Sequence, residues 1–225
     1  MRLDFASLWR YWPDLMAGIW LTIQLSVLST VLGFVLGTLC AIGSTSRCVW
    51  CRRIVGIYVE VIRNTPLLVQ IFIVYFGLAT LGLKIGPLVA AVLALVINIG
   101  AYTSEIVRAG IEVAPKGQLE AAESLGLTSW QVLRKIVLLP AIEKVYPALS
   151  SQFILLMLAT SVTSQIAAEE LTAVANRVQS DTFRSFEVYI VAAGFYLLLS
   201  LLMRAGFWAI GQVVFTRKRR LGTTL

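Results

Sequence analysis

The sequence predicts an all-α integral membrane protein in which five helices cross the membrane, with the N-terminus outside and the C-terminus inside. Of the 225 residues, 58% are hydrophobic and 14% are charged, and the mean hydropathy is +0.83. An average soluble domain has about 45–50% apolar and about 25% charged residues. The apolar residues gather into five long stretches, and the basic residues lie mainly at the ends of these stretches. The net charge of +7 therefore reflects membrane topology, and we expect no nucleic-acid partner.

The chain begins with an aromatic segment and a long apolar stretch. Residues 1–14 mix aromatic and charged side chains, and we expect an interfacial helix that ends at Pro13. The apolar stretch 15–43 is long enough for one tilted span and lacks the small-residue cleavage site of a signal peptide. Gly33 and Gly37 form a G-x-x-x-G pattern within it. This pattern indicates either a close approach of two helices or only the ordinary frequency of glycine in membrane helices.

The second and third spans are expected over 54–83 and 88–109, joined by a tight turn at 82–87. A short basic loop, 44–53, precedes them. Pro66 lies near the start of the second span and cannot donate a backbone hydrogen bond. We therefore expect a kink or local unwinding at this point.

The fourth span is expected over 142–166, with interruptions at Pro147 and at the polar run 160–165. The remaining segments are a polar connector, the last span and a basic tail, at 167–186, 188–214 and 215–225.

The basic residues also predict the orientation of the spans, which together cover 15–214. If the loop 44–53 is cytoplasmic, alternation of five spans places the polar loop 111–141 and the tail 215–225 on the same side. The opposite side then holds only five basic residues, which are Arg2, Arg10, Lys84, Arg177 and Arg184. All three inner segments satisfy the positive-inside rule, which gives an outside N-terminus and an inside C-terminus.

The polar loop 111–141 carries the signals of two short helices. Residues 120–125 are mostly good helix formers, and Gly126 is placed to end this helix with a left-handed cap. Thr128, followed three residues later by Gln131, predicts a capping box that starts the second helix. One side of the first helix carries apolar or small residues, which are Leu119, Ala122, Leu125 and Gly126. Glu120 and Glu123 lie on its other faces. Such a segment can dock onto another protein, although a solvated amphipathic helix has the same pattern.

Six residues of this loop match a known motif; they are Glu120, Ala121, Ala122, Gly126, Ile136 and Leu138. In this order and spacing they resemble the EAA motif of permease subunits of bacterial ATP-binding cassette importers. The resemblance implies a coupling helix that sits in a cleft of the cytoplasmic ATP-binding subunits. The chain departs from the motif at one point, because Leu139 occupies the place of a proline and Pro140 follows one residue later.

Further stretches resemble the polar amino-acid subfamily of these permeases, and the match covers nearly the whole chain. They are residues 58–70, 100–108, 115–118 and 182–187. The resemblance implies a permease subunit of an ATP-driven importer of polar amino acids in the bacterial inner membrane. It also implies a second permease copy or a related permease as partner, and an extracytoplasmic substrate-binding protein. Many relatives have a Lys-Asp pair before Thr160, where this chain has Leu158 and Ala159, so a charge preference for the substrate does not carry over.

Polar residues within the spans are candidates for a substrate path. Ionisable groups are costly in a membrane and tend to face a bundle interior or cavity, which singles out Glu60, Arg63 and Glu105. The alternatives are an ion pair that fixes packing and a charge that snorkels to the interface. Deeper neutral residues can hydrogen-bond the ammonium and carboxylate groups of an amino acid; they are Asn98, Gln152, Thr160 and Ser161. Hydrogen bonding between helices is the alternative role for these residues.

Several classes of function are disfavoured. The sequence has no G-x-x-x-x-G-K-[ST], so ATP and Mg²⁺ are expected on partner subunits, with no cofactor on this chain. It has no histidine, and Cys40, Cys48 and Cys51 are too few for a zinc site, so no metal is expected; a redox pair is the alternative for Cys48 and Cys51. An intramembrane enzyme would need a nucleophile–base pair or a metal cluster. A passive channel or scaffold would not need the loop 111–141.

Overall fold

A computed structural model describes residues 5–215, and every regular element among these residues is helical. The expected basic tail lies outside the described residues except for Phe215, as do residues 1–4. Four described helices are long and apolar enough to cross a membrane, and a bent pair of helices supplies a fifth candidate span. The all-helical membrane fold class is therefore confirmed.

The helices in chain order are η1 Ala6–Tyr11, α1 Trp12–Thr45, α2 Val49–Arg63, α3 Leu67–Phe72, η2 Ile73–Gly77, α4 Leu78–Thr80, α5 Pro87–Glu112, α6 Lys116–Ser124, α7 Ser129–Gln131, η3 Val132–Leu138, α8 Leu139–Ala159, η4 Thr160–Ile166, α9 Leu171–Thr182 and α10 Ser185–Val214. The element η1 runs directly into α1, so Pro13 lies in the first turn of the long helix instead of ending a separate one. Proline is suited to this position because the first helical N–H groups have no intrahelical acceptor.

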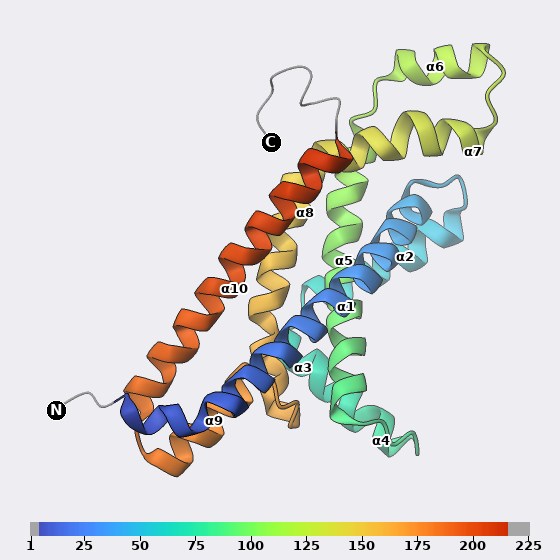
Figure 1. The fold of residues 1–225 in the computed structure, drawn as a ribbon. Coiled ribbons are helices and arrows are strands. Elements are labelled where there is room, and N and C mark those ends of the chain that lie inside the picture. Colours follow the sequence, from blue (N-terminus) through green and yellow to red (C-terminus); the bar gives the residue numbers. More distant parts are fainter. Residues whose placement is uncertain (1–4, 216–225) are drawn as a thin grey trace.

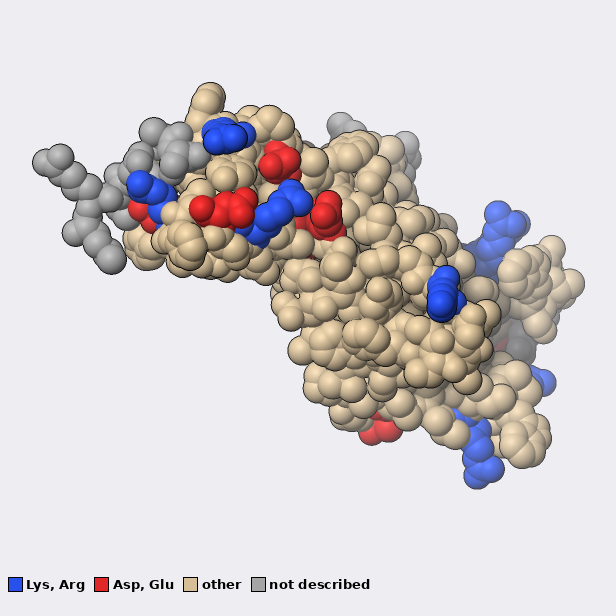
Figure 2. Space-filling model, turned by 90° about the horizontal axis from the view of Figure 1, so that it is seen from below, with Lys and Arg blue, Asp and Glu red and all other residues tan. Residues whose placement is uncertain are grey.

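The long helices connect two ends of the molecule. Figure 1 shows α5 and α8 running between these ends, with α1 and α10 crossing obliquely. The short helices α6 and α7 stand beyond one end, together with the end of α10 and the α1–α2 connection, whereas α9 lies at the opposite end. Seen from the α9 end, most of the surface is uncharged, with a mixed group of acidic and basic side chains on one side and separate basic side chains on the other (Figure 2).

The two glycines of the G-x-x-x-G pattern lie where α1 meets α5. A Cβ atom at Gly33 would come within 2.1 Å of Ile99 Cγ2, and one at Gly37 would come within 2.7 Å of the Gly100 carbonyl oxygen and 2.5 Å of Thr103 Cβ. A side chain at Gly37 would press on the α5 backbone, and one at Gly33 would displace the Ile99 side chain. Of the two interpretations of the pattern, the close approach of helices is the one that the structure has.

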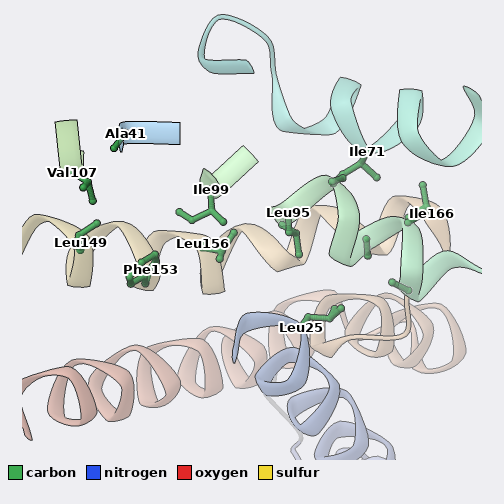
Figure 3. Packing of buried hydrophobic residues seen from close by; sticks show 14 residues of the cluster. Leu25, Ala41, Ile71, Leu95, Ile99, Val107, Leu149, Phe153, Leu156 and Ile166 are labelled. Atoms are coloured by element: carbon green, nitrogen blue, oxygen red, sulfur yellow. The ribbon is translucent and has the colours of Figure 1, made fainter. Parts of the chain in front are cut away.

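Buried side chains from five elements form the main core (Figure 3). It includes Leu25 of α1, Ile71 of α3, Ile99 of α5, Phe153 of α8 and Ile166 of η4. Large apolar side chains elsewhere are exposed along α1 and α10, as expected for helices whose outer faces contact lipid or another membrane subunit. The packed centre therefore lies around α5.

The second expected span is broken at the predicted place. Helix α2 ends at Arg63, Pro66 is the N-cap of α3, and the axes of the two segments differ by 110°. The side-chain amide of Gln70 spans the break, because its Nε2 donates to the carbonyl oxygens of Ile62 (2.8 Å) and Thr65 (3.0 Å). The proline removes a helical donor, and the glutamine satisfies carbonyls that the break leaves without helical partners. The helix before the break starts at Val49, so the basic loop is shorter than expected.

The expectation that Pro147 interrupts the fourth span is wrong. Helix α8 continues through Pro147 from Leu139 to Ala159. The irregular backbone lies instead on either side, in the π-helical η3 and in the 3₁₀-helical η4, which contains the polar run 160–165. Proline removes only one backbone donor, and the flanking helix and its neighbours hold the α conformation here.

The expected polar connector 167–186 contains a helix, α9, with a buried apolar face against α1. Glu170 caps it, because its carboxylate accepts hydrogen bonds from the backbone N–H groups of Thr172 and Ala173 (both 2.9 Å). The Tyr196 hydroxyl of α10 donates to the same carboxylate at 2.6 Å. Glu170 is fully buried, and this burial raises the pKa of its carboxyl. The cap therefore joins α9 to the last span.

Candidate functional site

The polar loop forms a helical hairpin at one end of the bundle. Figure 1 shows α6 and α7 side by side beyond the ends of the long helices. Gly126 has φ of +73°, and the N–H groups of Leu125 and Leu127 donate to the carbonyl oxygens of Ala121 and Ala122, both at 3.1 Å. The predicted left-handed cap at Gly126 is thus confirmed. It satisfies carbonyls that the end of α6 would leave without partners.

The second helix of the hairpin starts as expected. The Gln131 side chain accepts from the Thr128 N–H at 2.9 Å, and the Thr128 hydroxyl accepts from the Gln131 N–H at 3.4 Å. The predicted capping box is confirmed. Two consecutive caps, with only Leu125–Thr128 between the helices, fix the angle of the turn.

The hairpin presents apolar side chains to its surroundings. Ala122 is buried, whereas Glu120 and Ala121 are exposed. Leu125 is 79% exposed and Trp130 is 65% exposed. The expected helix over 120–125 ends one residue earlier, at Ser124, so Leu125 belongs to the turn. A projecting hairpin with an exposed leucine and tryptophan has the properties of a protein-contact surface.

The ionisable candidates Arg63 and Glu105 come together between α2 and α5. Arg108 makes two hydrogen bonds to Glu105, at 2.9 and 2.8 Å, and Arg63 lies 3.5 Å from the same carboxylate. Arg108 also reaches Glu112 at 2.6 Å. Glu60 does not join this cluster, because its carboxylate accepts from the Asn64 amide at 2.8 Å. Within this chain, Glu105 accepts from two arginines and keeps part of its side chain exposed.

The neutral candidates are separate from one another. Asn98 donates to the Gln70 side chain at 2.9 Å and so supports the break between α2 and α3. Thr160 is fully buried and donates to the Met157 carbonyl, and half-buried Ser161 donates to the Leu158 carbonyl.

Gln152 is half-buried on α8. Among the described residues, no hydrogen bond or ion pair joins any two of the five path candidates.

Comparison with known proteins identifies the family. Residues 33–212 match the family described as "binding-protein-dependent transport system inner membrane component". The chain belongs to this family. It is 35% identical to the octopine transport system permease protein OccM of Rhizobium radiobacter, covering 97% of this chain and 93% of that protein. It is 34% identical to the glutamine transport system permease protein GlnP of Escherichia coli K12, covering 90% and 94%.

A solved structure of an amino acid ABC transporter with histidines has a chain that is 36% identical to this permease. That chain superposes with a TM-score of 0.85, covering 94% of this permease and 99% of itself. The MetNI methionine ABC transporter shares the fold, with a TM-score of 0.76 at 21% identity. The expected family is confirmed, and the chain is an integral inner-membrane subunit of a transport system and not an enzyme.

Two buried polar positions, Gln70 and Glu170, hold helix ends in place and are not predicted from the sequence. Gln70 was not singled out, although it follows Pro66 by one helical turn, the spacing at which a side chain can reach back over a helix break. Glu170 precedes an apolar periodic segment, as an N-cap does, but glutamate is not among the usual N-cap residues.

The described part of the permease has no cluster of three or more metal-ligating side chains. Cys48 and Cys51 lie at the start of α2 with their sulfur atoms 2.7 Å apart, and both are exposed free thiols.

Proposed function

We propose that this permease is the membrane subunit of an ATP-driven importer of polar amino acids. It forms the translocation path and transmits the work of cytoplasmic ATP-binding subunits through the hairpin at 115–140. The capped hairpin carries this proposal: α6 is ended at a left-handed glycine, followed by a capping box, and presents Leu125 and Trp130 beyond the bundle. The contact residues proposed for the ATP-binding subunits are Glu120, Ala121, Ala122 and Gly126. The names of the relatives, which are octopine, L-cystine and glutamine permeases, support an amino-acid substrate.

The proposed topology has five spans, counting α2 to α4 as one bent span, with an outside N-terminus and an inside C-terminus. The arrangement in Figure 1 supports it, because the α1–α2 connection, the hairpin and the end of α10 lie at one end. A reporter that is active only in the cytoplasm, fused after Arg220, is expected to be active. Activity of only a periplasm-specific reporter at this position would contradict the topology.

The proposed partners follow from the shape of one protomer. Five spans are few for an alternating path, and large apolar surfaces remain exposed on α1 and α10. We propose a second permease copy, or a related permease, about a two-fold axis, with one hairpin for each of two ATP-binding subunits. ATP and Mg²⁺ belong to those subunits, and a substrate-binding protein delivers the amino acid at the α9 end. No cofactor is assigned to this chain.

The proposed path residues are Asn98, Glu105, Gln152, Thr160 and Ser161. The exposed fraction of the Glu105 side chain, 27%, and the half-buried position of Ser161 support access from the path. The backbone around Thr160 is 3₁₀-helical, and irregular backbone at membrane depth is tolerated where it is buried in protein or lines a watery cavity.

Transport by the reconstituted complex tests the proposal. The permease is co-purified with its ATP-binding subunits and placed in proteoliposomes with its binding protein. Uptake of labelled glutamine, cystine or arginine is expected only when ATP is present on the hairpin side. Equal uptake without ATP, driven by the substrate gradient, would mean a passive channel and would overturn the proposal.

A further inference from the structure

The last span carries a cation that has no role in the function proposed above. Helix α10 contains two charged residues, Glu187 near its start and Arg204 in its second half. Glu187 lies 3.7 Å from Arg184. Arg204 is exposed, and no ion pair or side-chain hydrogen bond among residues 5–215 includes it. An arginine on a membrane helix is costly unless its guanidinium reaches a polar or anionic partner.

Arg204 lies close enough to the C-terminal end of α10 for its long side chain to reach the edge of a hydrocarbon layer. Ten residues separate it from the end of the helix at Val214, a rise of about 15 Å, while the whole helix is about 45 Å long. A hydrocarbon core is about 30 Å thick, so a helix of this length extends beyond it. Trp208, one turn further on, is 62% exposed, as is typical of aromatic residues at the interface. The Arg204 guanidinium can therefore extend to the headgroup level.

Arg204 lines an open groove of about 540 Å³ between α8 and α10. Its wall includes Tyr146, Ser150, Ser151, Ile154, Leu155 and Trp208. The Tyr146 hydroxyl donates to the Phe207 carbonyl and ties the two helices together at the groove. The hydroxyls of Ser150 and Ser151 donate to carbonyls of their own helix, at 2.9 and 3.0 Å. Arg204 is thus the one charged residue of the lining, and the rest of the wall is largely apolar.

We propose that this groove binds an anionic phospholipid, whose phosphate accepts from the Arg204 guanidinium while an acyl chain lies along Ile154, Leu155 and Trp208. A guanidinium matches phosphate oxygens with two parallel N–H donors. Basic pockets between membrane helices near the cytoplasmic surface are suited to anionic headgroups. The assignment to the inner leaflet rests on the proposed topology, whereas the lipid site itself does not.

Lipid retention by the purified full-length permease complex tests the site. Native mass spectrometry compares bound phosphatidylglycerol with phosphatidylethanolamine after exchange in detergent. Arg204→Gln is expected to lower phosphatidylglycerol retention about tenfold, the size of a charge-assisted hydrogen bond, and Arg204→Lys less. Ser151→Trp, which fills the groove and leaves the arginine in place, is expected to lower it similarly. Arg53→Gln removes an equal charge from an exposed position on α2 and is expected to leave retention unchanged.

Three results would overturn the proposal. Unchanged retention in Arg204→Gln would show that the arginine does not bind the lipid. Displacement of phosphatidylglycerol by inorganic phosphate alone would show a site for free anions. Unchanged retention together with weaker pairing of the permease subunits, measured by light scattering, would show that Arg204 faces a carboxylate of a partner subunit. Melting temperatures of all variants identify any loss of fold, and none of these readouts depends on transport.

Discussion

Replacing Gly126 tests whether the left-handed cap of α6 is needed for coupling. A Cβ atom at Gly126 would meet nothing within 4 Å, so the cost of a side chain there comes only from the backbone, whose φ is +73°. That conformation costs an L-residue about 1–2 kcal/mol, which lowers the population of the capped turn roughly 5- to 30-fold. Valine costs more than alanine because its β-branch is poorly tolerated at positive φ.

Gly117, which lies within α6, provides the matched control. A Cβ atom there also meets nothing within 4 Å, and no left-handed φ is involved. Alanine at Gly117 is expected to be neutral or to stabilise the helix by about 0.5–1 kcal/mol.

The assay measures ATP-dependent uptake in proteoliposomes, co-purification of the ATP-binding subunits, and the amount of permease in the membrane. We expect uptake to fall about fivefold for Gly126→Ala and further for Gly126→Val, at unchanged membrane levels. Gly117→Ala is expected to match the unmodified permease. If Gly126→Val matched Gly117→Ala in both uptake and co-purification, the capped hairpin would not be the coupling element.

Three other predictions concern packing, pH and the path. Gly37→Ala is expected to lower stability by about 1–3 kcal/mol, because its Cβ would press on the α5 backbone, whereas Gly56→Ala meets nothing and serves as control in thermal melts. Burial raises the pKa of Glu170, so its contribution to stability is complete below the pKa of the unfolded state, about 4.3, and is lost as pH rises through the pKa of the folded state. Glu170→Gln is expected to weaken the dependence of the melting temperature on pH. A cysteine at Ser161, with the native cysteines removed, is expected to react with a water-soluble thiol reagent and to be protected by substrate, whereas one at lipid-exposed Leu198 is not.

Each of these has a contradicting outcome. Equal melting temperatures for Gly37→Ala and Gly56→Ala would mean that α1 and α5 can separate at little cost. If the melting temperature changed with pH in the same way in the unmodified permease and in Glu170→Gln, the titration of Glu170 would not be linked to folding. If cysteines at positions 161 and 198 were labelled equally, with and without ATP, the fourth span would not line the path.

The sequence by itself determined the class of the protein and its local signals. Long apolar stretches leave few alternatives to membrane helices, because every backbone polar group must be satisfied within lipid. The cap at Gly126, the capping box at Thr128 and the break at Pro66 were predicted correctly, since each depends on residues within one helical turn.

Only the tertiary structure decided what depends on neighbours distant in the chain. It placed Gly33 and Gly37 in a close contact with α5. The sequence could not separate this role from the ordinary frequency of glycine in membrane helices. It paired Glu105 with Arg63 across two helices. It also kept α8 continuous through Pro147, because the cost of one missing donor is small beside the packing of a whole span. Local propensity sets where a helix can start, end or bend, whereas the contacts between helices set which of these possibilities occurs.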